Sequence, residues 1–72
     1  MRGNYYKDKS KYAKVSGIDV LNVRKVPNGE VLGELRNGDR VDVLEAGYIW
    51  TKIKYEGSEA FVVSKYMKEG IL

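Results

Sequence analysis

The chain has 72 residues, no cysteine, no histidine and a formal net charge of +3. A chain this short buries only about 60% of the surface that its unfolded form exposes, so we expect one domain without a deep catalytic cavity. Disulfides and thiolate metal sites need cysteine, and histidine is the most frequent general base and metal ligand. The composition therefore predicts a protein that is not an enzyme and holds no metal or cofactor.

The positive charge is concentrated at the start of the chain. Residues 1–14 hold five of the 13 basic residues and one of the 10 acidic ones, which leaves +4 there and −1 in the other 58 residues. Residues 1–11 are rich in tyrosine and lysine without helical or strand periodicity, so they are predicted to be a basic linker or tail. The sequence contains no secretory signal and no apolar run near the roughly 20 residues of a membrane span.

From residue 12 onward, short β-branched and aromatic runs alternate with glycine-bearing turns, which is typical of a small all-β barrel. Strands are predicted over residues 12–15, 18–24, 31–35, 40–44, 48–55 and 58–63. Turn signals separate them, and Glu56-Gly57 predicts a tight hairpin between the last two. Residues 64–67 lose the alternation and are predicted to form a 3₁₀ turn, followed by a short closing strand or a frayed end.

Four segments, in this order, resemble the bacterial SH3 domain family: LNVR at residues 21–24, VLGELRNGD at 31–39, WTKIKY at 50–55 and FVVSKYM at 61–67. Each segment is a weak signal alone, but their order and spacing make the combination specific. The resemblance covers residues 12–69 and leaves 70–72 as a frayed C-terminus. It implies a small SH3-like barrel of five to seven short antiparallel strands, with a 3₁₀ turn near the C-terminus.

The resemblance also implies a function. Domains of this family are commonly targeting modules of peptidoglycan hydrolases, phage endolysins, autolysins and exported cell-wall proteins, and their usual ligand is the peptide stem or cross-bridge of the wall. The implied location is extracellular or wall-associated, within a larger or phage-encoded protein whose catalytic activity resides in another domain. We expect the domain itself to be a monomer.

Strand alternation indicates which side chains face a ligand. Thr51, Ile53 and Tyr55 share one face of their strand, and Trp50 lies on the other. Because Ile53 is the better core residue, Trp50 is expected on a partly exposed face, where it would stack on a ligand. The alternative is that Trp50 caps the edge of the core. Tyr66 is expected to form a second wall of the same shallow groove or to close the barrel end, and Tyr48 to be a groove edge or merely exposed.

Two polar side chains alternate with apolar ones in the second predicted strand. Asn22 and Arg24 face away from Leu21 and Val23, so they either bind a ligand carboxylate or peptide backbone, or hydrogen-bond the loop that follows. The loop interpretation is favoured, because such residues beside a tight turn often satisfy local carbonyls. Asn28, in that loop, is predicted to belong to the opposite wall of the groove.

Three functions remain open from the sequence. The first is a cell-wall-targeting module, whose attachment to a hydrolase makes even weak binding effective. The alternative is a protein interaction or assembly domain without a wall ligand, acting through an exposed strand edge or the tyrosine-rich tail. Nucleic-acid binding through residues 1–14 is least favoured, because the remaining chain has no strong field of one sign.

Overall fold

The computed structural model describes residues 11–71, and the burial of side chains from residue 12 to residue 68. Seven antiparallel strands and one 3₁₀ turn follow one another as β1 (Lys11–Val15), β2 (Val20–Arg24), β3 (Val31–Arg36), β4 (Arg40–Glu45), β5 (Trp50–Tyr55), β6 (Ser58–Val63), η2 (Ser64–Tyr66) and β7 (Met67–Ile71). The all-β class, the number of strands and the 3₁₀ turn near the C-terminus are confirmed. Residues 1–10 of the predicted tail and Leu72 lie outside the described residues.

The ends of the described chain differ from the prediction. Lys11 belongs to β1 rather than to the tail, and β7 continues to Ile71, where a frayed end was expected from residue 70. The two strands pair along their whole length, with Lys11 opposite Ile71 and Val15 opposite Met67. Two outcomes were predicted for the C-terminal end, a short strand or a frayed end. The strand is correct as far as Ile71, because these residues pair with β1.

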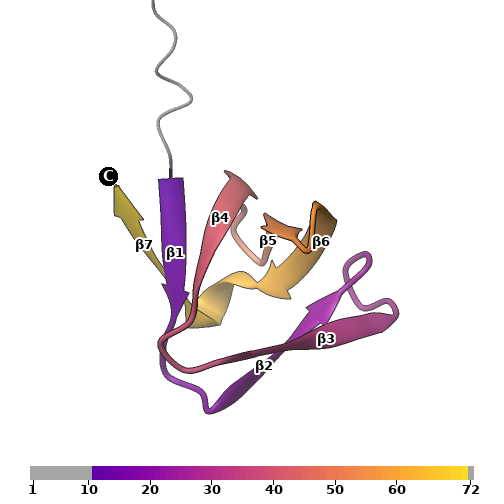
Figure 1. Cartoon of the computed structure of the whole chain (residues 1–72), viewed down its shortest axis with the longest axis horizontal. Helices are drawn as coiled ribbons and strands as arrows, with labels where there is room; N and C mark the ends of the chain where they lie inside the picture. Colours follow the sequence, from indigo (N-terminus) through magenta and orange to yellow (C-terminus); the bar gives the residue numbers. More distant parts are fainter. Residues whose placement is uncertain (1–10, 72) are drawn as a thin grey trace, which may run out of the picture.

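The strands form one sheet in the order β3-β2-β6-β5-β4-β1-β7. β5 and β6 pair over six residues, but β2 and β6 are joined by the single pair Arg24 and Phe61. This narrow junction allows β2 and β3 to turn away from the other strands, and in Figure 1 they run below the upright β1, β4 and β7. β3 and β7 are the outer strands, and within residues 11–71 no pairing between them closes the sheet into a barrel.

The bend brings one face of the sheet against itself and creates the core. Among residues 12–68, its buried apolar side chains come from β1 to β6: Ala13, Val15, Leu21, Val23, Leu35, Val43, Ile53, Ala60 and Val62. The predicted alternation is correct in both strands for which it was argued. Leu21 and Val23 are buried while Asn22 is exposed, and Ile53 is completely buried.

The tight turns use residues that tolerate a positive φ. Glu56 and Gly57 have φ of 51° and 83°, as in the two-residue hairpin turn whose twist matches that of the strands it connects. Asn28 has a φ of 62° and follows Pro27 in a turn closed by the bond from the Gly29 N–H to the Val26 carbonyl, 2.8 Å. A proline followed by a residue of positive φ is the arrangement of a type II turn.

Tyr55 crosses the core to meet β3, although β2 and β6 lie between β5 and β3 in the sheet. Its ring packs against the core cluster, and a Cβ placed on Gly33 would overlap the Tyr55 hydroxyl and lie 3.0 Å from Cζ. Gly33 thus leaves room for the ring between the two parts of the bent sheet. Any larger residue would have to displace the ring from the core.

A small hydroxyl network fastens η2 to the loop before β5. Ser64 Oγ donates a hydrogen bond to the Gly47 carbonyl, 2.8 Å, and lies 2.6 Å from Thr51 Oγ1. A hydroxyl has one proton, and a carbonyl only accepts, so Thr51 must be the donor to Ser64. The Ser64 N–H also donates to the Ile49 carbonyl, 2.8 Å. Thr51 is only 4% exposed, so its end of the network is shielded from water, whereas the bond to Gly47 is exposed.

Replacing Gly33 by alanine tests the contact between β3 and Tyr55. We expect Gly33→Ala to lower the free energy of unfolding by about 1–3 kcal/mol, the usual range for overpacking a core. Tyr55→Phe removes the hydroxyl that the new methyl group would overlap, so Gly33→Ala should be less damaging in that background. Urea unfolding of the two single variants and the double variant measures both effects. Strictly additive effects would contradict the contact.

Removing the two hydroxyls of the network one at a time tests the direction of its hydrogen bonds. Ser64→Ala leaves both the Thr51 hydroxyl and the Gly47 carbonyl without their partner, and should lower the free energy of unfolding by about 1–3 kcal/mol. Thr51→Val removes a donor but leaves the bond to Gly47 intact, so it should have the smaller effect, about 1 kcal/mol. Urea unfolding compares the two variants. A larger loss for Thr51→Val would show that the assigned donor is wrong.

Candidate functional site

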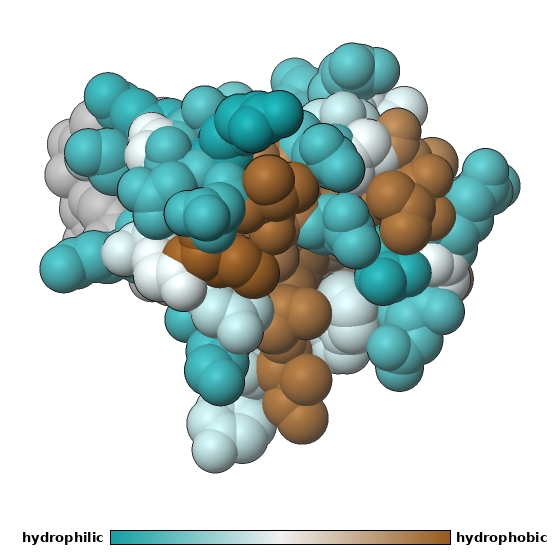
Figure 2. Space-filling model, turned by 90° about the horizontal axis from the view of Figure 1, so that it is seen from below, coloured by the Kyte–Doolittle hydropathy of each residue, from teal (hydrophilic) through white to brown (hydrophobic). Residues whose placement is uncertain are grey.

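The outer face of β4, β5 and β6, opposite the core, changes character along the strands. The cross-strand partners on it are Trp50 with Val63, then Lys52 with Phe61 and Glu45, then Lys54 with Glu59 and Asp42. Trp50, Phe61 and Val63 are half-buried, and we call these three side chains the aromatic end. The other end of the face is formed by charged side chains. Seen from below, the side on which β2 and β3 lie in Figure 1, the molecule carries a band of apolar side chains between hydrophilic ones (Figure 2).

Trp50 lies on the predicted side of its strand. Thr51 and Ile53 are buried on the core side of β5, whereas Trp50 is half-buried on the outer face. The loop before it exposes two more large side chains, Ile49 at 62% and Tyr48 at 97%. Tyr48 therefore contributes little to packing within the described residues and is available to a ligand next to the tryptophan.

Tyr66 is half-buried and packs against the core cluster, with its ring beside Gly17, which supports the interpretation that it has a structural role. Lys65 Nζ lies 5.6 Å from the centroid of its ring. The backbone of η2 starts beside β5, because Val63 pairs with Trp50 and the Ser64 N–H donates to the Ile49 carbonyl. Trp50 faces outward while Tyr66 packs on the core, so a groove shared by the two rings stays a prediction.

Arg24 makes the hydrogen bond that the loop interpretation expected. Its Nη1 donates to the Gly29 carbonyl, 2.8 Å, across the turn in which Asn28 adopts its positive φ. Both residues therefore have a local structural role, and ligand binding by them stays a prediction. Asn22 is exposed and lies opposite Glu34 of β3, beyond the junction at which β2 meets β6. The structure groups Arg24 and Asn28, and separately Trp50 and Tyr48, and places Asn22 apart from both.

Sequence reasoning missed two residues of this face. Phe61 and Val63 alternate with the buried Ala60 and Val62, so strand periodicity would have placed them beside Trp50. Strand alternation does place Lys52 on the same face as Trp50, but its ionic partners come from two other strands and could not be predicted from a local pattern.

Lys52 links the aromatic end to the charged end of the outer face. Its Nζ lies 3.6 Å from Glu45 Oε1, 3.8 Å from Glu59 Oε1 and 5.9 Å from the centroid of the Phe61 ring. It therefore places a fixed cation between the aromatic end and the two carboxylates.

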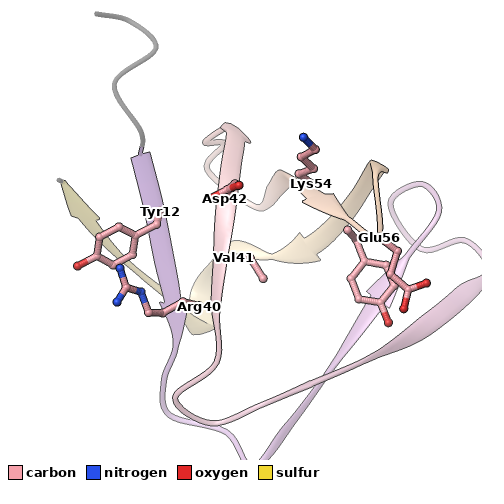
Figure 3. A pocket seen from close by; sticks show the side chains of 7 residues that line it. Tyr12, Arg40, Val41, Asp42, Lys54 and Glu56 are labelled. Atoms are coloured by element: carbon pink, nitrogen blue, oxygen red, sulfur yellow. The ribbon is translucent and has the colours of Figure 1, made fainter.

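Two concave regions are lined by residues within the part of the chain that the structure describes. One, of about 390 Å³, lies where β1, β4 and the β5–β6 turn meet, and Figure 3 shows Tyr12 and Arg40 on one side of it and Glu56 on the other. A smaller one, of about 210 Å³, lies beside Gly47, Thr51 and Ser64. Among residues 11–71 no group of histidine, cysteine or acidic residues is arranged to hold a metal ion. That same part of the chain has no helix long and apolar enough to cross a membrane.

Comparison with known families gives one match. The model of the bacterial SH3 domain matches residues 19–68, that is, β2 to β6, η2 and the start of β7, while β1 precedes the matched region. No curated protein matches the chain. Domains of this family are non-catalytic, are generally cell-wall binding modules, and typically bind peptides of the wall. With most of its length matched and an all-β fold of the SH3 type, the chain belongs to the bacterial SH3 domain family.

Proposed function

We propose that this domain targets a larger protein, such as a peptidoglycan hydrolase, an endolysin or another exported protein, to the bacterial cell wall by binding the peptide stem or cross-bridge. The observation that carries the proposal is the aromatic end of the outer face. A half-buried tryptophan lies there beside a tyrosine that is 97% exposed, in a domain whose family generally binds the wall.

The aromatic end suits an extended peptide. Rings supply a large contact area with few rotatable bonds, so little conformational entropy is lost on binding. Trp50 and Phe61 are also held by the strands that carry them, which orders them before any ligand arrives. The Trp50 indole N–H and the Lys52 ammonium group then offer hydrogen bonds to peptide carbonyls. This combination of an apolar surface with a few polar donors is typical of peptide grooves.

High affinity is not required for this function. The wall presents its peptides as a dense repeat, and attachment to the wall keeps a tethered enzyme near its substrate. Under these conditions the next binding event occurs at the effective concentration that the tether sets. A shallow site that binds weakly is therefore sufficient.

An assembly domain is the second candidate, and edge strand β3 is the observation that favours it. Val31 and Leu32 of this strand are 44% and 42% exposed. However, Val23 pairs with Gly33 and Arg24 with Val31, which leaves Leu32 as a bulge residue in β3. Bulges of this kind hinder the addition of another strand.

The oligomeric state separates the two candidates. If the domain is a wall-binding module, light scattering should give the mass of one chain, 8.2 kDa, over a wide range of protein concentration. A stable dimer that dissociates into monomers in the Val31→Lys variant would instead favour assembly through β3.

Wall binding itself is tested by sedimentation with purified bacterial cell walls. Trp50→Ala should reduce the affinity at least about tenfold, since a tryptophan at the centre of an interface commonly contributes 2 kcal/mol or more. Tyr48→Ala should also reduce it. Because the Tyr48 side chain is almost fully exposed, this variant should keep the stability of the parent, so a loss of binding reports on the ligand.

Leu44→Ala is the matched control, because Leu44 is 49% exposed on β4 and is not part of the aromatic end. It should bind walls as the parent chain does. Failure of the parent to sediment with any wall preparation, or equal binding by the parent, Trp50→Ala and Tyr48→Ala, would refute the proposed function.

A further inference from the structure

The larger of the two pockets described above differs in chemistry from the aromatic end. Its interior is apolar and aromatic, with half-buried Tyr12, Val41 and Tyr55, and four exposed charged side chains surround it: Arg40, Asp42, Lys54 and Glu56. A half-buried apolar floor with a polar rim is the usual anatomy of a small-ligand site. Tyr12 comes from β1, which precedes the residues matched by the family model, whereas the other lining residues lie within the matched region.

Arg40 is positioned for a ligand carboxylate. Its guanidinium carbon lies 4.1 Å from the centroid of the Tyr12 ring, so the ring orients the guanidinium group. A stacked guanidinium keeps its N–H groups at the edge, where they bind a carboxylate through two parallel hydrogen bonds. Among the described side chains, no carboxylate lies within 4.0 Å of Arg40; the only ion pairs there are those of Lys52.

Asp42 and Lys54 face each other on neighbouring strands, yet they form no ion pair within residues 12–68. Opposite charges in directly paired positions usually interact. Here the ammonium group and the carboxylate are both left for a ligand. Glu56 adds a second carboxylate at the β5–β6 turn, on the far side of β4 from Arg40 (Figure 3).

The balance of charge selects the kind of ligand. Two basic and two acidic side chains line the pocket, so their formal charges cancel. A polyanion such as a phosphate polymer or nucleic acid would meet repulsion from Asp42 and Glu56, whereas a ligand with one charge of each sign finds a partner for both. A short peptide with free ends is such a ligand. Three extended residues span roughly 10 Å, so such a peptide is short enough to be considered for a hollow of this size.

We propose that this pocket binds a short peptide with free ends, its carboxylate on Arg40 and its ammonium group on Glu56, with small side chains over Tyr12 and Val41. The proposal rests on the proposed function only in taking peptides as the ligand class. It concerns a site separate from the aromatic end, so the two fail or succeed in different experiments.

The test is an NMR titration of the ¹⁵N-labelled full chain with trialanine, with N-acetyl-trialanine, which lacks the ammonium group, and with trialanine amide, which lacks the carboxylate. Trialanine should shift the amide signals of Tyr12, Arg40, Lys54 and Glu56. Each capped peptide should bind about three- to fivefold more weakly, the range expected for one exposed ion pair.

Two substitutions assign the ends of the peptide. Arg40→Gln should weaken binding of trialanine about three- to fivefold and leave binding of trialanine amide unchanged, because that ligand has no carboxylate to lose. Glu56→Gln should weaken the binding of trialanine by a similar factor and leave the binding of N-acetyl-trialanine unchanged, because that ligand has no ammonium group. Arg36→Gln, the same change on an exposed arginine of β3, is the control and should leave the binding of all three peptides unchanged.

Two outcomes would overturn the proposal: no shift of the pocket signals at millimolar trialanine, or equal affinity for the free and both capped peptides. Trp50→Ala separates this site from the one proposed above. It should weaken sedimentation with walls at least about tenfold while the trialanine shifts persist. If walls bind but trialanine does not, only the present proposal is wrong; if trialanine binds but walls do not, only the proposed function is wrong.

Discussion

The bend of the sheet is the feature on which the rest of the structure depends. The described chain has no helix to cover the apolar side of its strands, so a single sheet must bury one face against itself. It does so by turning β2 and β3 across the other strands at a junction of one residue pair, Arg24 and Phe61. Tyr55 then spans the core to reach β3, and Gly33 is the residue whose missing side chain makes that approach possible.

Once one face of the sheet is buried, strand periodicity determines which side chains lie on the outer face. Ile53 and Thr51 are committed to the core side of β5, so Trp50, Lys52 and Lys54 must face outward. The neighbouring strands obey the same rule and add Phe61 and Val63 at one end and Asp42 and Glu59 at the other. The aromatic end and its charged continuation therefore follow from the packing of the core.

Local features of the fold were predictable from the sequence, and non-local ones were not. The strands, the Glu56-Gly57 hairpin and the orientation of Trp50 follow from a period of two and from residues that adopt positive φ. The extent of β1 and β7 depends instead on their mutual pairing, in which Lys11 meets Ile71 from the other end of the chain. The contact of Tyr55 with Gly33 likewise joins strands that are not neighbours in the sheet.

The candidate site also has local features that were predictable from the sequence and non-local features that were not. Alternation placed Trp50 correctly, but the hydrogen bond from Arg24 to Gly29 and the packing of Tyr66 on the core depend on how the chain folds back. The pocket beside Tyr12 could not be foreseen, because its lining comes from β1, β4 and the β5–β6 turn. Stacking of Arg40 on Tyr12 needs two strands whose pairing no local pattern specifies.

The two sites lie along one strand, and their spacing limits what can occupy both. Trp50 is the first and Lys54 the last of the outward-facing residues of β5. They are four residues apart, which is roughly 13 Å in an extended strand. An extended peptide of about four residues covers the same length. The peptide proposed for the charged pocket keeps both of its free ends there, so the two proposed sites would take two different peptides of the wall. Binding at either site would then raise the local concentration of wall peptides at the other, and two shallow sites joined in this way would hold the wall more firmly than either does alone.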